Sequence, residues 1–114
     1  MPKEKAVSII YTETFKHSAT DVRDYLAHYH EDPKEIIDKQ LDEFENKVRI
    51  FPEGCQISRD LSALGCYRYR ECITKDGYRI LYSFDPNANE LTTHVILGQK
   101  QSVQQLLFDR IISM

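Results

Sequence analysis

The sequence has no strong excess of one charge, no long apolar run and few cysteines. No apolar stretch among its 114 residues approaches the roughly 20 that span a bilayer. No signal-peptide core follows the opening Met-Pro-Lys-Glu-Lys. The formal net charge of −3 weighs against undirected nucleic-acid binding, for which a clearly basic domain is typical. We expect a cytoplasmic protein that does not enter a membrane.

The three cysteines are odd in number and lack the spacing of metal ligands. Cys66 and Cys72 fall on one expected strand, where six residues span about 20 Å, too far for a disulfide. The simplest interpretation is small buried thiols in a reducing compartment. The sequence also lacks a glycine-rich phosphate loop, a Ser-His-Asp set and a metal-ligand cluster, so we expect no cofactor and no metal.

The length is typical of a single domain over residues 1–114, large enough to fold without a disulfide or metal. Charge is unevenly distributed along it. Residues 1–56 carry 8 Lys+Arg against 12 Asp+Glu, whereas residues 57–114 carry 7 against 6. The acidic side chains gather on the expected helices, and the second half is slightly basic.

The first half of the sequence predicts a strand and two helices. Residues 6–11 are β-prone, and residues 14–30 have helical periodicity, with Thr12 and Thr14 as alternative N-caps. Asp32 and Pro33 are typical of the start of a second helix, which should end before Pro52. Its apolar stripe repeats at intervals of 4, 3, 4 and 3 residues: Ile37, Leu41, Phe44, Val48 and Phe51. The link between these two helices is short, which predicts that they form an antiparallel helical hairpin.

The second half predicts a sheet and a last helix. Residues 52–64 are predicted to form a loop with a helical turn at 61–64. Three strands follow, with turns at Asp76-Gly77 and at residues 86–89, and the third strand covers 92–97. Ser102 and Gln105 form a capping box before an apolar helix over 103–112. The order β-α-α-β-β-β-α predicts an α+β fold, with the helical hairpin on one face of a small antiparallel sheet.

A two-residue turn at Asp76-Gly77 would also set the register of its hairpin. It pairs Ile73 with Ile80, and strand partners share a face. An apolar face then forms toward the helices: Tyr69, Ile73, Tyr78, Ile80, Tyr82 and Phe84. The other face carries Arg68, Arg70 and Arg79. Arg68 could have either of two roles: contact with a target, or an ion pair with Asp85, its partner in this register.

The stretch Cys-Tyr-Arg-Tyr-Arg at 66–70, followed by Gly-Tyr-Arg-Ile-Leu-Tyr at 77–82, resembles toxins of the RelE/ParE superfamily. These are the toxic halves of bacterial type II toxin–antitoxin pairs, often linked to plasmid stabilisation. The resemblance covers nearly the whole chain. It implies a cytoplasmic toxin that is held silent by a cognate antitoxin protein.

The resemblance also assigns residues. In RelE-type members, which cut messenger RNA on the ribosome, two basic residues lie one apart on one strand and an arginine lies on the next. Arg70 and Arg79 match catalytic positions, and Arg68 and Lys100 match target-binding ones. The tyrosine of the last helix has no counterpart, because Phe108 and two leucines stand there. His94 is the nearest histidine that could carry a proton in its place.

Three functions remain open. The basic residues favour a RelE-like, ribosome-dependent messenger RNA endonuclease. The second is a ParE-like, non-enzymatic inhibitor of DNA gyrase, and the third is an interaction module without toxicity. In the superfamily, antitoxins often cover the last helix, so four apolar residues are expected to bind the antitoxin: Val103, Leu107, Ile111 and Ile112. Ile111 and Ile112 cannot both face inward, so one should belong to an exposed apolar patch.

Overall fold

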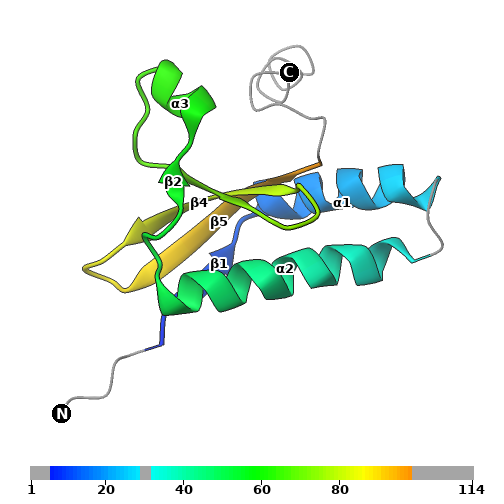
Figure 1. Ribbon diagram of the computed structural model, residues 1–114, viewed down its shortest axis with the longest axis horizontal. Coiled ribbons are helices and arrows are strands. Elements are labelled where there is room, and N and C mark those ends of the chain that lie inside the picture. Colours follow the sequence, from blue (N-terminus) through cyan, green and yellow to red (C-terminus); the bar gives the residue numbers. More distant parts are fainter. Residues whose placement is uncertain (1–5, 29–31, 99–114) are drawn as a thin grey trace.

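The computed structural model describes residues 6–28 and 32–98, in which two long helices lie on one face of a five-stranded sheet (Figure 1). The elements are β1 (Ser8–Tyr11), α1 (Glu13–Ala27), α2 (Pro33–Ile50), β2 (Gln56–Ile57), α3 (Arg59–Ala63), β3 (Arg70–Ile73), β4 (Arg79–Asp85) and β5 (Glu90–Leu97). The expected α+β fold is confirmed. The helix expected over 103–112 lies outside the described residues.

Both long helices begin at capping residues that the sequence predicted. The Thr12 side chain accepts a hydrogen bond from the Phe15 N–H at 3.0 Å, so Thr12 and not Thr14 caps α1. Asp32 accepts from the Glu35 N–H at 3.1 Å, with Pro33 as the first helical residue of α2. The prediction that the first helix extends to residue 30 is wrong, because α1 ends at Ala27.

The apolar stripe of α2 packs into the core, with Phe44 and Val48 fully buried. The Phe44 ring meets the Tyr82 ring edge-on, with centroids 5.5 Å apart. Phe51, the last member of the predicted stripe, is 62% exposed instead. It lies beyond the helix, where the backbone has turned away from helical geometry.

The sheet has the strand order β1-β5-β4-β3-β2 and is mixed. The prediction of an antiparallel sheet is wrong at one edge, where β1 runs parallel to β5 and Ser8 pairs with Glu90. The other pairs are antiparallel. A parallel pair needs a crossover connection, and here the helical hairpin and the other strands provide it.

The hairpin between β3 and β4 differs by one residue from the predicted register. Its loop has three residues: Thr74 and Tyr78 pair across it, since the Thr74 N–H donates to the Tyr78 carbonyl at 2.9 Å. Gly77 adopts a φ of 86°, which favours glycine. Ile73 therefore pairs with Arg79 and not with Ile80.

The helix α2 stabilises this register. The Gln40 side-chain N–H donates to the Asp76 carboxylate at 2.7 Å, and the Lys75 N–H donates to Glu43 at 2.9 Å. Lys39 adds an ion pair to Asp76 at 3.3 Å. These contacts hold the loop residues 75 and 76 against the helix. A turn predicted from the local sequence alone cannot take such contacts into account.

The register decides which side chains face the helices. Ile80 is fully buried beneath them, as expected, but Ile73 is 46% exposed on the opposite face. A β-bulge between Leu81 and Tyr82 shifts the pairing with β5. On the face away from α1 and α2, a small second cluster packs against α3: Leu81, Val95 and Leu97 with Leu61.

The segment expected as a loop contains both a two-residue strand and a helix. The short strand β2 pairs with β3 at the edge of the sheet. Ser58 then caps α3, accepting from the Leu61 N–H at 3.4 Å. Figure 1 shows α3 standing apart from the helical hairpin, beyond β2. No helix within the described ranges is long and apolar enough to cross a membrane.

Candidate functional site

The three arginines do not share one face of the sheet, which corrects the expected arrangement. Arg79 pairs with Ile73 and lies on the face that α3 approaches. Arg70 pairs with Tyr82 and projects toward the loop that follows α2. The one-residue change in register is the cause, because side chains alternate between faces with a period of two.

Arg79 is held between two carboxylates. Its Nη1 atom lies 3.3 Å from Glu71 Oε1 and 3.6 Å from Asp60 Oδ2. Glu71 is only 7% exposed. A carboxylate so well buried needs a partner. Arg79 therefore neutralises Glu71 and ties β4 to α3.

Arg70 is also engaged, on the other side. Its Nη1 donates to the Cys55 carbonyl at 2.7 Å, and its Nη2 lies 3.6 Å from Glu53 Oε2. Both partners belong to the loop between α2 and β2. Arg70 thus anchors this loop over the edge of the sheet, and part of its charge is compensated.

Arg68 and Arg70 do come together, in a groove of about 510 Å³ beside the last residues of β4. The groove forms because β3 begins only at Arg70, which leaves the end of β4 without a neighbouring strand on that side. Its lining includes both arginines and three carboxylates: Glu53, Asp85 and Glu90. The groove is thus mixed in charge.

The ion pair with Asp85, which was the alternative role for Arg68, is not among the ion pairs within the described ranges, although both residues line the groove. Arg68 is exposed. It is therefore the arginine of the three whose charge is best placed to meet a ligand.

His94 lies beside the groove residues. Its Nε2 is 2.8 Å from Ser83 Oγ, and the Tyr69 ring meets its imidazole edge-on at 5.0 Å. Burial is the larger cause that lowers the pKa of His94, and the nearby charge of Arg68 adds to it. The imidazole is therefore neutral near pH 7 and can accept a proton.

Several candidate residues lie outside the described ranges: Lys100, Val103, Leu107, Phe108, Ile111 and Ile112. Among residues 6–28 and 32–98, no group of three His, Cys, Asp or Glu side chains is placed to hold a metal ion.

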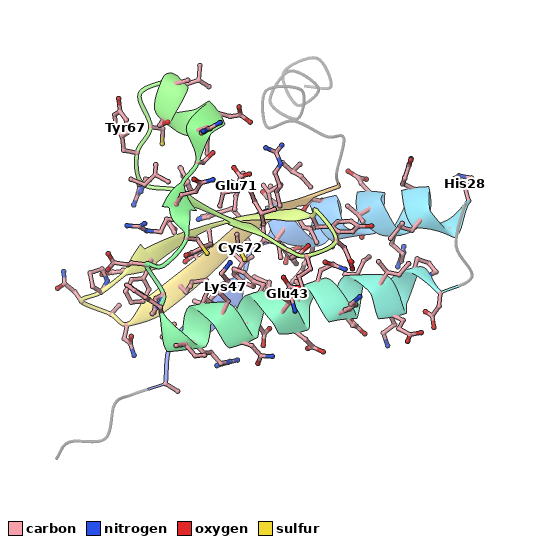
Figure 2. All side chains as sticks on the ribbon, in the orientation of Figure 1. His28, Glu43, Lys47, Tyr67, Glu71 and Cys72 are labelled. Atoms are coloured by element: carbon pink, nitrogen blue, oxygen red, sulfur yellow. The ribbon has the colours of Figure 1, made fainter. Side chains whose placement is uncertain are left out.

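Sequence reasoning missed the acidic partners of the arginines. Glu53 and Asp60 come from a segment that was expected to be a loop, and no local pattern connects them to the strands. Pairing of Glu71 with an arginine could have been predicted, since Glu71 lies within an apolar strand next to arginines. Figure 2 shows Glu71 on the side of β3 toward α3, and Cys72 on the side toward α2.

Comparisons with known proteins agree with this fold. A family model described as the ParE toxin of the type II toxin–antitoxin system parDE matches residues 9–102. The fold is similar to a chain in the crystal structure of the toxin–antitoxin complex RelBE2 from Mycobacterium tuberculosis. That match has a TM-score of 0.61 at 13% identity, and covers 87% of this chain and 98% of that one. A search of curated protein sequences gave no match.

The fold is that of the RelE/ParE toxins, with a helical hairpin packed on a mostly antiparallel sheet. The family match extends over most of the chain, from β1 past the end of β5. The chain belongs to the ParE toxin family of type II toxin–antitoxin systems.

Proposed function

We propose that this toxin acts in a ParE-like manner, by binding a macromolecular target without cutting RNA. DNA gyrase is the target of the ParE-type members of the superfamily, and we propose that the toxin meets it in the cytoplasm. The observation that supports this proposal is the separation of Arg70 and Arg79. They project from opposite faces of the sheet, each beside a carboxylate.

Cutting RNA through its 2′-hydroxyl requires several positive charges around one phosphate, together with groups that move protons. Arginine forks suit phosphate oxygens when they are free to bind them. A phosphate at Arg79 would have to displace Glu71, which is 7% exposed and would lose its partner. That exchange is costly, so Arg79 is better suited to hold the fold together.

A second candidate is RelE-like cleavage of messenger RNA on the ribosome, favoured by the groove that Arg68 and Arg70 share. Here Arg68 would bind the target and Arg70 would leave Glu53 to contact a phosphate. His94 would supply the base, since it is half-buried beside Ser83 and its pKa is lowered. In this candidate Lys100 adds a further contact to the target.

The family description names a type II toxin–antitoxin system, so we propose a cognate antitoxin as the physiological partner. The apolar residues expected to bind it are Val103, Leu107, Ile111 and Ile112. Co-purification of the toxin with the product of a neighbouring small gene tests this. Recovery of the toxin without such a partner would contradict it.

Two assays on the same purified toxin distinguish gyrase from ribosome-bound messenger RNA as the target. One incubates it with ribosomes and messenger RNA and maps the cuts. The other incubates it with gyrase and plasmid DNA and measures gyrase-linked breaks. We expect DNA breaks and intact messenger RNA. Messenger RNA cut by the wild type, and spared by Arg68→Ala and Arg70→Ala, would establish the second candidate instead.

A variant of an arginine outside the groove lining provides the control. Arg49 lies on α2, pairs with Glu45 at 3.2 Å, and is not among the residues that line the groove. Arg49→Ala should behave as the wild type in both assays. A folded wild-type toxin with no effect in either assay and no effect on growth would support the non-toxic interaction module.

A further inference from the structure

Two cysteines that are far apart in the sequence face each other within the core. Cys55 is 6% exposed and Cys72 is fully buried. In the register of β2 and β3, Gln56 pairs with Glu71 and Ile57 pairs with Arg70. One step beyond β2, the same register places Cys55 directly opposite Cys72.

The hydrogen-bond pattern shows what kind of pair this is. The Ser58 N–H donates to the Tyr69 carbonyl at 2.9 Å, so these two residues form a hydrogen-bonded pair. Such pairs alternate with non-hydrogen-bonded ones along an antiparallel ladder. Counting back, Cys55 and Cys72 occupy a non-hydrogen-bonded position, where Cα atoms lie about 4.5 Å apart and side chains are closest. That spacing falls within the range that a disulfide bridges.

The side chains agree with the backbone. Both residues belong to the same cluster of buried core residues, and their interaction lowers the pKa of Cys55 while it raises that of Cys72. The Tyr82 hydroxyl, which donates to the Pro52 carbonyl at 2.7 Å, also lowers the pKa of Cys55. Positive charges of Lys47 and Arg70 favour the Cys55 thiolate further. Figure 2 shows Cys72 on the side of the sheet facing α2, which carries Lys47.

We propose that Cys55 and Cys72 form a reversible oxidation site that closes to an intramolecular disulfide when a peroxide is present. The Cys55 thiolate attacks one peroxide oxygen, and the O–O bond breaks to give a sulfenic acid. With hydrogen peroxide as the oxidant, the leaving hydroxide takes a proton and departs as water. Cys72 then loses its proton and attacks the Cys55 sulfur, and the second oxygen leaves as water.

Both sulfurs are oxidised by one electron each, and the peroxide is reduced by two. A small oxidant suits the site, because Cys55 retains little exposed surface. A dithiol reverses the bond by exchange at either sulfur.

The disulfide would constrain a functional part of the chain. It closes the segment 55–72, which contains β2, α3 and the groove residue Arg68. The two ends of this segment pair through the two residues of β2, and the hydrogen bond from Ser58 to Tyr69 extends that pairing. Closing a loop of this size removes conformational freedom from the unfolded chain and stabilises the folded one.

Cys66 provides a matched control. It is the third free cysteine, and it lies inside the same segment but is only partly buried. It is six residues from Cys72 and is not opposite Cys55 in the ladder. A nonspecific oxidation would favour Cys66, since accessible thiols react first.

The test treats the purified, reduced full-length toxin with hydrogen peroxide and maps its disulfides by mass spectrometry of non-reduced peptides. We expect a Cys55–Cys72 link in the wild type and in Cys66→Ser, and its loss in Cys72→Ser and in the more apolar Cys72→Ala. The thermal midpoint of the oxidised wild type should rise by roughly 10 °C, and dithiothreitol should return it to its starting value.

A link through Cys66, a sulfinic acid at Cys55 without a crosslink, or unreacted thiols would overturn the proposal. The peptide map of the wild type decides this whether or not the variants fold. A lower thermal midpoint after crosslinking would also overturn it, because it would show that the two sulfurs must be strained to meet. None of these outcomes depends on which target the toxin binds.

Discussion

Arg79 of β4 and Glu71 of β3 are diagonal neighbours on one face of the sheet, with Arg79 Nη1 3.3 Å from Glu71 Oε1. Glu71 is 7% exposed, so this ion pair is largely shielded from water. The pair links two strands at the position where a catalytic arginine was expected.

Arg79→Ala should lower the free energy of unfolding by roughly 2–3 kcal/mol, because it leaves a buried carboxylate without its main donor. Urea denaturation measures this. Arg68→Ala serves as the control, since Arg68 is exposed and should change stability by less than about 0.5 kcal/mol. Equal, small effects of both substitutions would show that the Glu71 contact contributes little.

Two phenylalanines near the end of α2 should differ sharply. Phe44 is fully buried against Tyr82, whereas Phe51 is 62% exposed. Phe44→Ala should cost about 3–5 kcal/mol of stability, through lost burial and a cavity, and Phe51→Ala less than about 1 kcal/mol. The same denaturation assay compares them. A larger loss from Phe51→Ala would contradict the packing of α2 described above.

Asp76 makes stability depend on acid pH. The Gln40 hydrogen bond is the larger cause that lowers its pKa from 3.8, and Lys39 adds to it. A carboxyl whose folded pKa is depressed stabilises the protein above its unfolded pKa, and the contribution is lost as the pH falls through the folded value. Wild type should therefore exceed Asp76→Asn in stability at pH 7.

The two proteins should converge below the folded pKa of Asp76, since asparagine resembles the protonated carboxyl. Unfolding curves at neutral and strongly acid pH measure the difference. Lys39→Gln should retain most of the pH dependence, because it leaves the Gln40 hydrogen bond in place. A gap between wild type and Asp76→Asn that stays constant with pH would contradict this account.

His94 has a pKa below 6.5 because it is half-buried and Arg68 is nearby. In the unfolded protein this imidazole binds a proton more readily than in the folded protein. The free energy of unfolding is therefore highest above the unfolded pKa, and it declines as the pH falls through 6.5 toward the folded pKa of His94. Arg68→Ala should raise the pKa of His94 but leave it below 6.5, because burial is the larger cause. An NMR titration of the imidazole protons measures this, with Arg49→Ala as the control. An unchanged pKa in Arg68→Ala would place the guanidinium away from the ring.

The helices could be predicted from the sequence because their signals are local. Asp32 followed by Pro33 defines the start of α2 through a side-chain cap and a preset φ. The apolar spacing from Ile37 to Val48 defines its buried face within a few turns. The hairpin at Asp76-Gly77 was placed for a similar reason, since a glycine with positive φ was needed there.

The candidate site could not be predicted as well, because it depends on a register. A two-residue and a three-residue loop both use Gly77, and the sequence does not distinguish them. Contacts from Gln40 and Glu43 on α2 select the longer loop. That shift of one residue moves Ile73 out of the core and sends Arg70 and Arg79 to opposite faces.

The sequence by itself therefore determined the two long helices with their caps, the order of the longer strands, and the toxin family that the strand motifs resemble. Tertiary structure decided how the strands align and which side chains meet. Caps and periodicity act over a few residues, whereas the Arg79–Glu71 contact and the Cys55–Cys72 pair depend on the alignment of strands. That alignment is set by packing against α2, and so no local pattern encodes it.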